Sequence, residues 1–553
     1  MKEEMKGLYA AIITSLIVIF LANWLFPKNT STATPVTNES IPTIEKVDEA
    51  PLPQNNIMET SQATSKDARI KIRNSSLEGS LRLKGARLDE LYLSKYKQNL
   101  DENSPSVELL SPAQTANPYY FEFGWLASQP EILLPQADTI WQNRGGDLTP
   151  STPLTLEWNN GKGLKFIRKI SIDDNYMFKI EQIVENNTNK DISLHPYGLI
   201  NRKPQSTENA TKVVHEGMVG VIDSTLKEIK FNDLKKDKKQ DFNTSGGWIG
   251  FSDHYWLGAL ILNNNTESKV KFAKTDDNTY QTDFVGEPIT IKAGSVATSS
   301  NNFFAGAKEI RLLDEYTKKL NIDKFDLAVD FGWYYFLTKP FFYILDYLYR
   351  FIGNMGWAIL LFAALLRLAM FPIANKSFES MSKMKKIQPK IKDLQDKFKD
   401  DKVKLQTEMM NLYKKEKINP ASGCLPMFIQ IPVFFSLYKV LNIAIEIRHA
   451  PFIGWIKDLS APDPMTVSAI TNIPLPSFLD IGVWPILMGA TMYIQQKLNP
   501  APANKDQARM FALMPLLFMF MLGHFASGLV IYWTLSNILS IIQQRVIMKK
   551  VGV

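Results

Sequence analysis

Apolar residues are distributed unevenly along the 553-residue chain. One apolar run covers residues 8–26, a mainly polar stretch reaches from residue 28 to about residue 330, and several long runs rich in Met and Phe follow from about residue 340. A helical membrane span needs about 20 consecutive apolar residues, whereas a soluble domain mixes apolar and polar positions at short periods. The pattern therefore predicts a soluble domain joined to a helical membrane domain.

The first apolar run predicts a membrane anchor. At 1.5 Å per residue, residues 8–26 would span about 28 Å, close to the thickness of a hydrocarbon core. Bulky residues such as Trp24 end this run where a cleavable signal peptide carries small residues, so the anchor is expected to stay uncleaved. Residues 1–7 precede it, and the Ser-, Thr-, Pro- and Asn-rich residues 27–66 predict a flexible tether.

Short strands separated by turn residues are predicted for residues 67–319. The clearest stretch places its apolar side chains on even positions, on either side of a turn at residues 173–175: Ile170, Ile172, Tyr176, Phe178, Ile180 and Val184. Side chains two residues apart share one face of a strand, so this stretch predicts a hairpin with one buried face. Gly161 and Gly163 predict another hairpin turn, and the whole segment favours a large all-β sandwich.

The polar stretch carries no recognisable catalytic pattern. It lacks paired carboxylates, a Ser/His/Asp arrangement and a phosphate-binding loop, and the five histidines of the chain are scattered without metal-ligand spacing. The single cysteine, Cys424, excludes an intramolecular disulfide framework and a cysteine metal cage. No catalytic residue, metal site or cofactor is therefore predicted, and the protein is not expected to be an enzyme.

The C-terminal part predicts five transmembrane helices behind an interfacial segment. Residues 320–353 are rich in aromatic residues but interrupted by charges and Pro340, which favours an amphipathic helix at the membrane surface. The predicted spans, six in all with the anchor, are residues 354–374, 424–446, 480–497, 510–525 and 527–547. The segments between and after them are the loops 375–423, 447–479 and 498–509 and the tail 548–553.

The distribution of positive charge predicts the orientation of these spans. Loop 375–423 holds thirteen lysines and seven acidic residues, a balance of 13 − 7 = +6, whereas loop 447–479 balances at 2 − 2 = 0. Basic loops stay on the cytoplasmic side of a membrane. Six spans then place both termini and loop 375–423 in the cytoplasm, and the β domain outside.

Loop 375–423 predicts a helical hairpin. Ile387, Ile391, Leu394 and Phe398 follow one another at steps of four, three and four, and a second apolar stripe follows residues 400–401, which provide a cap. Pro389 is expected to kink the first helix. The residues expected to contact partners are Met381, Lys383, Met384, Lys385, Lys386, Met409 and Met410. Packing within the hairpin and binding of RNA, an acidic receptor or anionic lipid all stay open.

Arg367 lies inside the predicted span 354–374, within the sequence LLFAALLRLAMFPIANK. An arginine at the centre of a span costs about 2.5–3.5 kcal/mol on insertion scales. No Asp or Glu lies inside the five C-terminal spans away from their ends, so no ion-pair partner is evident, and snorkelling to the surface is the simpler alternative. We expect a water-filled cavity on the cytoplasmic side, lined by Gln430, Ser436, Thr534 and Asn537.

The order of these features resembles the YidC/Oxa/Alb3 family of membrane protein insertases, and in particular its Gram-negative bacterial members. The matching segments extend from about Phe325 to the C-terminus: the span with Arg367, then SMSKMKKIQPKIKDLQDKF, INPASGCLPMFIQIPVFFSLYKVL, GATMYIQQKL and FASGLVIYWTLSNILSIIQQ. The resemblance implies a hydrophilic intramembrane groove that contains Arg367, Tyr532 and Trp533. It also implies an outer β-supersandwich similar to sugar mutarotases.

The same resemblance implies partners and a location. The expected partners are nascent membrane proteins, the Sec translocon, the ribosome, the receptor of the signal recognition particle and the lipid bilayer, and the expected location is the bacterial inner membrane. The sequence departs from the family at Ala363, often a polar position, and at Trp533, where a second tyrosine is common.

Two alternatives to the insertase come from other functional classes. A transporter or channel predicts inverted repeats, which these spans do not display. A membrane-tethered carbohydrate enzyme predicts convergent carboxylates in the β domain, which its sequence does not reveal.

Overall fold

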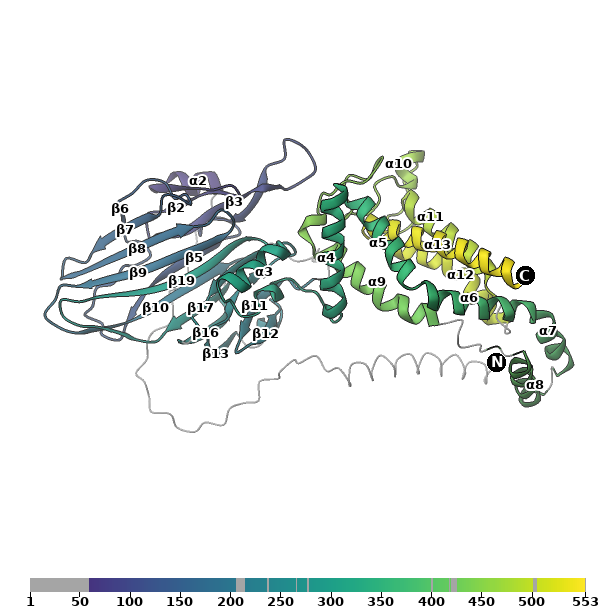
Figure 1. Ribbon diagram of the computed structural model, residues 1–553. Helices are drawn as coiled ribbons and strands as arrows, with labels where there is room; N and C mark the ends of the chain where they lie inside the picture. Colours follow the sequence, from purple (N-terminus) through teal and green to yellow (C-terminus); the bar gives the residue numbers. More distant parts are fainter. Residues whose placement is uncertain are drawn as a thin grey trace. The chain divides into compact units, whose positions relative to one another are not determined.

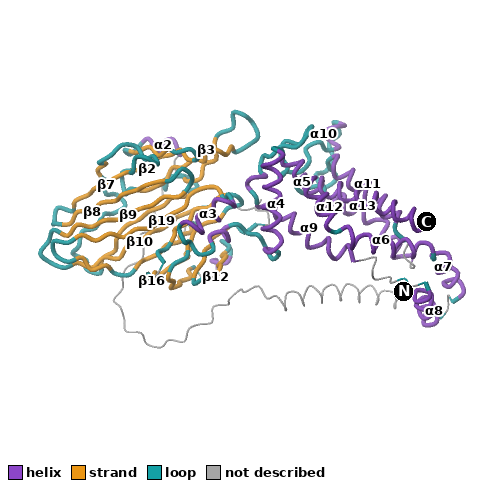
Figure 2. The backbone as a smooth tube through the Cα atoms, viewed as in Figure 1, coloured by secondary structure: helices purple, strands orange, loops and turns teal. Residues whose placement is uncertain are grey.

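The structure, a computed structural model, has strands in its N-terminal part and helices in its C-terminal part (Figures 1 and 2). The expected all-β region followed by a helical region is thus confirmed. The described residues belong to one compact unit, Asp48–Val553. The predicted N-terminus 1–7, the anchor 8–26 and most of the tether lie outside the described residues. These are 59–204, 214–235, 238–264, 266–275, 278–398, 401–416, 418, 425–500 and 505–552.

The β region consists of two antiparallel sheets, preceded by the short helix α2 (Thr60–Ser65). The first sheet runs β1 (Arg69–Arg73), β2 (Leu77–Arg82), β3 (Arg87–Lys97), β5 (Tyr119–Ala127), β10 (Ile192–Arg202), β17 (Tyr280–Gly286), β16 (Glu267–Lys274) and β13 (Lys239–Ser245), with β4 (Ser106–Leu110) on β3 and β18 (Ile289–Ile291) on β10. The second runs β12 (Thr225–Ile229), β11 (Gly217–Ile222), β14 (Trp248–Ser252), β15 (Trp256–Ile261), β19 (Val296–Ala307), β9 (Met177–Asn186), β8 (Leu164–Ile172), β7 (Leu154–Asn159) and β6 (Gln142–Asn143).

The hairpin predicted from the even-numbered apolar positions is the pair β8 and β9. Ile170 lies opposite Ile180, and Ile172 lies opposite Phe178. The residues predicted for the buried face are all almost fully buried, because both strands direct the same face toward the other sheet. Gly161 has a φ of 69° in the turn before β8, as the predicted hairpin turn requires.

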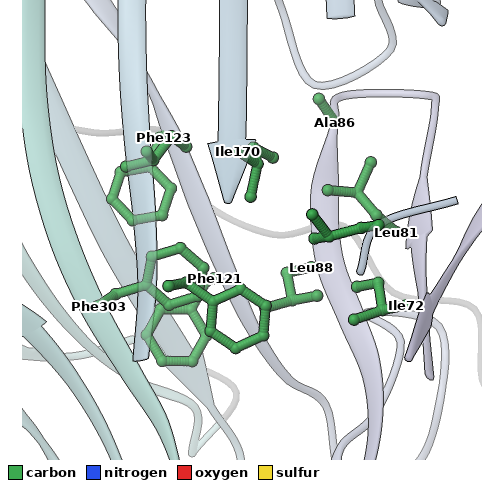
Figure 3. A pocket seen from close by; sticks show the side chains of 11 residues that line it. Ile72, Leu81, Ala86, Leu88, Phe121, Phe123, Ile170 and Phe303 are labelled. Carbon is green, nitrogen blue, oxygen red and sulfur yellow. The ribbon is translucent and has the colours of Figure 1, made fainter. Parts of the chain in front are cut away.

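Aromatic side chains fill the space between the sheets. The Phe303 ring stacks on Phe178 at a centroid distance of 4.6 Å and lies 5.0 Å from the Phe121 ring. Figure 3 shows Phe303, Phe121 and several aliphatic side chains around a small internal cavity of about 10 Å³. A space of this size holds at most about one water molecule, and its lining is apolar. The cavity is a minor packing gap rather than a binding site.

Helix α3 (Ile310–Lys319) closes the β region and joins it to the helices. The hydroxyls of Tyr96 and Tyr176 each donate to Glu309 Oε1 at 2.9 Å. The N–H of Ile310 donates to Glu446 Oε1 at 3.2 Å, and Arg448 Nη2 donates to the carbonyl of Lys97 at 2.8 Å. The chain that follows helix α9 is therefore hydrogen-bonded to the β region.

The helical region contains α4 (Tyr335–Ile352), α5 (Met355–Ala369), α6 (Phe371–Lys386), α7 (Gln388–Lys397), α8 (Lys402–Lys415), α9 (Leu425–Ile443), α10 (Val467–Thr471), α11 (Val483–Leu498), α12 (Lys505–Leu522) and α13 (Ser527–Val551). Among the described residues, no single helix has both the length and the apolar composition for crossing a membrane. The bent pair α5 and α6 meets both conditions together, and Phe428–Ile443 and Ala508–Leu522 are shorter apolar helices.

The predicted span 354–374 differs from the structure, since it is not one helix. Helix α5 ends at Ala369, and α6 begins at Phe371 with a bend of 67° between the two axes. Pro372 explains the break, because proline has no N–H for an intrahelical bond and its ring clashes with the preceding turn. The same residue fits the first turn of α6, where N–H groups have no helical partner.

Where a hairpin of two helices was predicted, the structure has three helices, α6, α7 and α8. Pro389 lies in the first turn of α7, so the first predicted helix is interrupted just before the proline. Asp401 caps α8 by accepting a hydrogen bond from the N–H of Lys404 at 3.0 Å, as predicted. Ile387, Ile391 and Ile418 form the small apolar core between these helices.

Candidate functional site

Helix α13 carries a polar face into the interior of the helical region. It packs against α5, α6, α9 and α11. Its buried side chains include a series of uncharged polar residues at helical spacing: Ser527, Thr534, Asn537, Ser540, Gln543 and Gln544. Buried polar groups are costly unless they find hydrogen-bond partners, so a polar face of this length requires an explanation beyond packing.

Arg367 occupies the last turn of α5, next to the bend into α6. Its guanidinium carbon lies 5.6 Å from the centre of the Phe378 ring on α6. The Nε and Nη2 atoms are buried and have no hydrogen-bond partner among the described residues. The Tyr532 hydroxyl of α13 is close enough to interact electrostatically with the guanidinium. This arrangement leaves donors available for water or for an acidic ligand.

The predicted groove residues on α9 and at the start of α13 lie near one another. Gln430 Nε2 donates to the Tyr532 hydroxyl at 3.2 Å. Ser436 is completely buried, and its hydroxyl has no partner among the described residues. Trp533 lies in a different environment. Its ring packs edge-on against the Phe434 ring, with 4.6 Å between the ring centres, and also contacts Phe518.

Further along α13, polar side chains connect it to neighbouring helices. Asn537 Nδ2 donates to Thr491 Oγ1 of α11 at 3.1 Å. Thr534 bonds within its own helix, since its hydroxyl donates to the Val530 carbonyl at 2.8 Å. Gln430 and Tyr532 thus make a polar contact with each other, and Asn537 makes one with α11. The Thr534 hydroxyl is hydrogen-bonded within its own helix.

Sequence reasoning missed the C-terminal half of this polar face. Gln543 Nε2 donates to the Phe371 carbonyl at 3.4 Å, and Gln544 Nε2 donates to Asn499 Oδ1 at 3.0 Å. The Oε1 atoms of both glutamines are buried and unpartnered within the described part of the chain. The signal was present in the sequence, because Thr534, Asn537, Ser540 and Gln544 recur at steps of three, three and four.

The hairpin residues predicted to contact partners have different environments. Met381 packs against the cluster of Ala374, Phe378 and Ile547, and Met384 and Met409 pack against the hairpin core. Met410 is about half exposed and lines, with Leu405, Gln406, Met409 and Tyr413, a surface hollow of about 190 Å³. Only Met410 of the four methionines is therefore strongly exposed.

The hairpin lysines lie at or near the surface. Lys383 and Lys386 are exposed, and Lys383 pairs with Glu379 at 2.8 Å. Lys385 Nζ lies 3.4 Å from the Lys497 carbonyl at the end of α11. The described residues include no group of three or more His, Cys, Asp or Glu arranged to hold a metal ion.

Comparison with known proteins covers nearly the whole chain. Residues 69–344 match the model of the YidC periplasmic domain, and residues 347–552 match the model of the 60Kd inner membrane protein family. A protein of Rickettsia bellii called membrane protein insertase YidC is 44% identical over 560 residues, which cover 99% of this chain and all of that protein. A protein of the same name from Beijerinckia indica is 43% identical and covers 100% of this chain and 97% of its own length.

A solved structure is also similar. It is described as the crystal structure of an active YidC insertase with the first transmembrane domain resolved. It aligns with a TM-score of 0.36 and 17% identity, over 87% of this chain and 92% of that chain. The full-length identity above 40% to the two relatives decides the assignment: the chain belongs to the YidC family of membrane protein insertases.

Proposed function

We propose that this protein inserts hydrophobic segments of nascent proteins into the bacterial inner membrane, with its β region in the periplasm. Membership of the family supports this activity and location. The observation on which the proposal most depends is Arg367, whose buried Nε and Nη2 donors have no partner among the described residues. The polar face of α13 provides a hydrophilic surface beside it.

The proposed groove lies between α5, α9 and α13, and it receives the hydrophilic tail of a substrate. An acidic group about 4 Å from Arg367 would gain about 4 kcal/mol at an effective dielectric constant of 20. This gain exceeds the cost of placing an arginine in a span. The ionic interaction is noncovalent and reversible, so the tail is held only transiently. With the outside positive, the membrane potential adds about 2.3 kcal/mol per negative charge per 100 mV.

The hydrophobic segment of the substrate is proposed to leave the groove along α9 and α12. Helix α9 exposes Phe428, Ile431 and Phe435 at steps of three and four, which places them on one face. Helix α12 exposes a similar series at Met510, Leu513, Leu517 and Met521. An apolar segment moving from water onto such faces gains about 25 cal/mol per Å² of buried surface, and no covalent step is needed.

The topology proposed for this activity has six spans, with the anchor 8–26 first and both termini in the cytoplasm. The hairpin of α6, α7 and α8 then faces the cytoplasm, where its lysines and the exposed Met410 are available to the ribosome and to the receptor of the signal recognition particle. Cooperation with the Sec translocon is part of the same proposal.

The decisive experiment compares substrates with acidic and neutral tails. In cells depleted of the native insertase, Arg367→Ala is expected to lower insertion of an acidic-tailed substrate by about tenfold, equivalent to 1.4 kcal/mol, and that of a neutral-tailed substrate by no more than about twofold. Arg367→Lys should retain most of the activity because the charge remains. Insertion is measured by protease accessibility of the translocated tail.

Arg545 supplies the matched control. It lies on the exposed side of α13, away from the polar face, so Arg545→Ala removes the same charge without touching the proposed groove. Unchanged insertion of the acidic-tailed substrate by Arg367→Ala would contradict the proposed role of this residue. Ion flux through reconstituted vesicles that disappears with Arg367→Ala would instead favour a channel.

A further inference from the structure

The loop that precedes α11, which includes the short helix α10, is unusual for a loop exposed to water. Its sixteen residues from Pro464 to Leu479 include no Asp, Glu, Lys, Arg or His. Four of its large apolar side chains are exposed: Ile470 by 57%, Ile473 by 59%, Phe478 by 65% and Leu479 by 38%. Contiguous exposed apolar surface of this kind marks a surface that contacts a partner or a membrane.

Two carboxylates hold the base of this loop in place. Asp463 Oδ1 accepts from the indole N–H of Trp455 at 2.9 Å, and its Oδ2 accepts from the N–H of Trp484 at 2.8 Å. Asp480 accepts from both the N–H and the hydroxyl of Ser468. The base is therefore tied to α10 and α11, and the apolar side chains project instead of folding back onto the protein.

The backbone of the loop exposes few hydrogen-bond donors. Pro474 and Pro476 have no N–H, the N–H of Asn472 donates to Ser468 at 2.9 Å, and that of Leu479 donates to Pro476 at 2.9 Å. Non-helical backbone is tolerated near lipid only where its polar groups are satisfied internally or reach the headgroups. This backbone suits the boundary between headgroups and acyl chains.

The apolar surface of the loop continues onto two helices. His524, just after α12, lies with its Nε2 2.8 Å from the Ser477 carbonyl, which fixes the loop against that helix. Helix α11 exposes Ile486 and Leu487 in its first turns after the loop, and α12 exposes Leu513 and Leu517. A partner that covers the loop must therefore be apolar and must also cover the exposed faces of these helices. A lipid bilayer meets both requirements.

We propose that the loop 464–479 inserts into the leaflet on the side of the β region and lies at the interface of that leaflet. The side follows from Arg448, near the start of the preceding segment, which is hydrogen-bonded to Lys97 of the β region. The inference rests on the membrane location proposed above. It adds a lipid-contacting element beside α11, whose 16 residues span only about 24 Å.

The test places an environment-sensitive fluorophore on the loop of the full-length protein. Cys424 is the only cysteine, so Cys424→Ser combined with Phe478→Cys gives a single labelling site. The labelled protein is reconstituted at low density into vesicles of phosphatidylethanolamine and phosphatidylglycerol. Quenching is measured with nitroxides on acyl carbon 5 or 12 and with aqueous iodide.

Leu100→Cys in the same background is the matched control. Leu100 is 52% exposed, like Phe478, but it lies between β3 and β4 beside Asp101 and Glu102. We expect the label at position 478 to be quenched about threefold more by nitroxide lipid than the label at position 100, and about threefold less by iodide. The carbon-5 nitroxide should quench more strongly than the carbon-12 nitroxide.

Several outcomes would overturn the proposal. Equal iodide quenching at positions 478 and 100 would place the loop in water. Shielding from iodide without nitroxide quenching would show that protein covers the loop, either a second copy or a partner carried through purification. The same label in an Arg367→Ala background separates this inference from the proposed function: lipid contact should persist there even if insertion is lost.

Discussion

In the β region Phe303 and Trp248 are almost completely buried, whereas in the helical region Phe351 is 81% exposed and Leu368 is 68% exposed. Several polar residues show the reverse arrangement. Side chains of the β region such as Lys179 and Lys269 face outward, while Thr534, Asn537 and Gln544 of α13 are buried. The contrast holds for large apolar side chains, most of whose exposed members lie in the helices, whereas both regions bury polar groups, among them Asp89 and Arg168 of the β region.

The difference indicates which solvent surrounds each region. Burial of aromatic rings is favourable when the alternative is water, which accounts for the core around Phe303. Exposure of large apolar side chains is favourable only when the surroundings are lipid, and a polar interior is useful only if water or a polar ligand enters it. The comparison supports a membrane location for the helices and a groove on α13.

The largest expected effect comes from truncating a buried aromatic ring in the β region. Phe303→Ala removes contacts with Phe178 and Phe121 and is expected to lower the free energy of unfolding by about 3–5 kcal/mol. Urea unfolding of the detergent-solubilised protein, followed by tryptophan fluorescence, measures the change. Phe351→Ala, the control on exposed α4, should change it by less than about 0.5 kcal/mol; equal losses would contradict the comparison.

A smaller effect is expected from Lys308, a buried lysine of the β region. Its Nζ donates to Ser252 Oγ at 2.9 Å, and burial lowers the pKa of Lys308 from 10.5 to about 8. Between these values the unfolded chain binds the proton and the folded chain does not, so stability rises with pH from about 8 to 10.5, by about 3 kcal/mol in total.

The measurement for Lys308 is the free energy of unfolding at pH 7 and pH 10. Lys308→Met should remove the increase, because no buried ammonium then has to lose its proton. Lys269→Met replaces an exposed lysine of β16 and should leave the increase intact. A pH dependence that is the same in all three proteins would show that another group is responsible.

A still smaller effect tests the polar face of α13. The contact between Asn537 and Thr491 should contribute about 0.6–1 kcal/mol in a double-mutant cycle of Asn537→Ala and Thr491→Val, in the usual range for hydrogen bonds between membrane helices. The cycle is read from unfolding in detergent. A coupling of several kcal/mol would mean that this interior is dry and tightly packed, which contradicts a groove open to water.

The smallest effect concerns a tight turn of the β region. Asp223 and Ser224 connect β11 to β12 with φ values of 47° and 57°, the left-handed conformation of a type I′ turn. Ser224→Gly creates the favoured Asp-Gly pair and should raise the free energy of unfolding by about 0.5–1 kcal/mol. Gly161→Ser, the converse change at φ 69°, should lower the free energy of unfolding. Stabilisation by both substitutions would contradict the expected cost of a left-handed conformation for a residue other than glycine.

The sequence predicted those elements that depend on local pattern. The β8–β9 hairpin followed from alternating apolar residues, and the Asp401 cap followed from a short polar residue before a helical stripe. The helix break at Pro372 was not predicted, although the proline was visible in the sequence. The apolar run continues through the proline, and hydropathy gives no information about a change in the direction of the helix axis.

The candidate site was predicted only in part. Arg367 was evident as a charge within an apolar run. Gln430 and Tyr532 make a polar contact with each other and Asn537 makes one with Thr491, while their place in a groove stays a prediction. Trp533 packs among aromatic rings instead, and Gln543 and Gln544 went unnoticed near the end of the span, where polar residues are common. Which side of a helix meets a neighbour depends on packing, and one sequence alone does not specify it.

By itself, the sequence determined the division into a β region and a helical region, because periodicity and apolar run length are local properties of the chain. It also determined that Arg367 has no carboxylate partner within its neighbouring apolar runs. Only the tertiary structure decided that α13 packs at the centre of the helices with its polar face inward, and that the loop 464–479 projects its apolar side chains outward. Both depend on contacts between segments far apart in the chain, and such contacts exist only once the chain has folded.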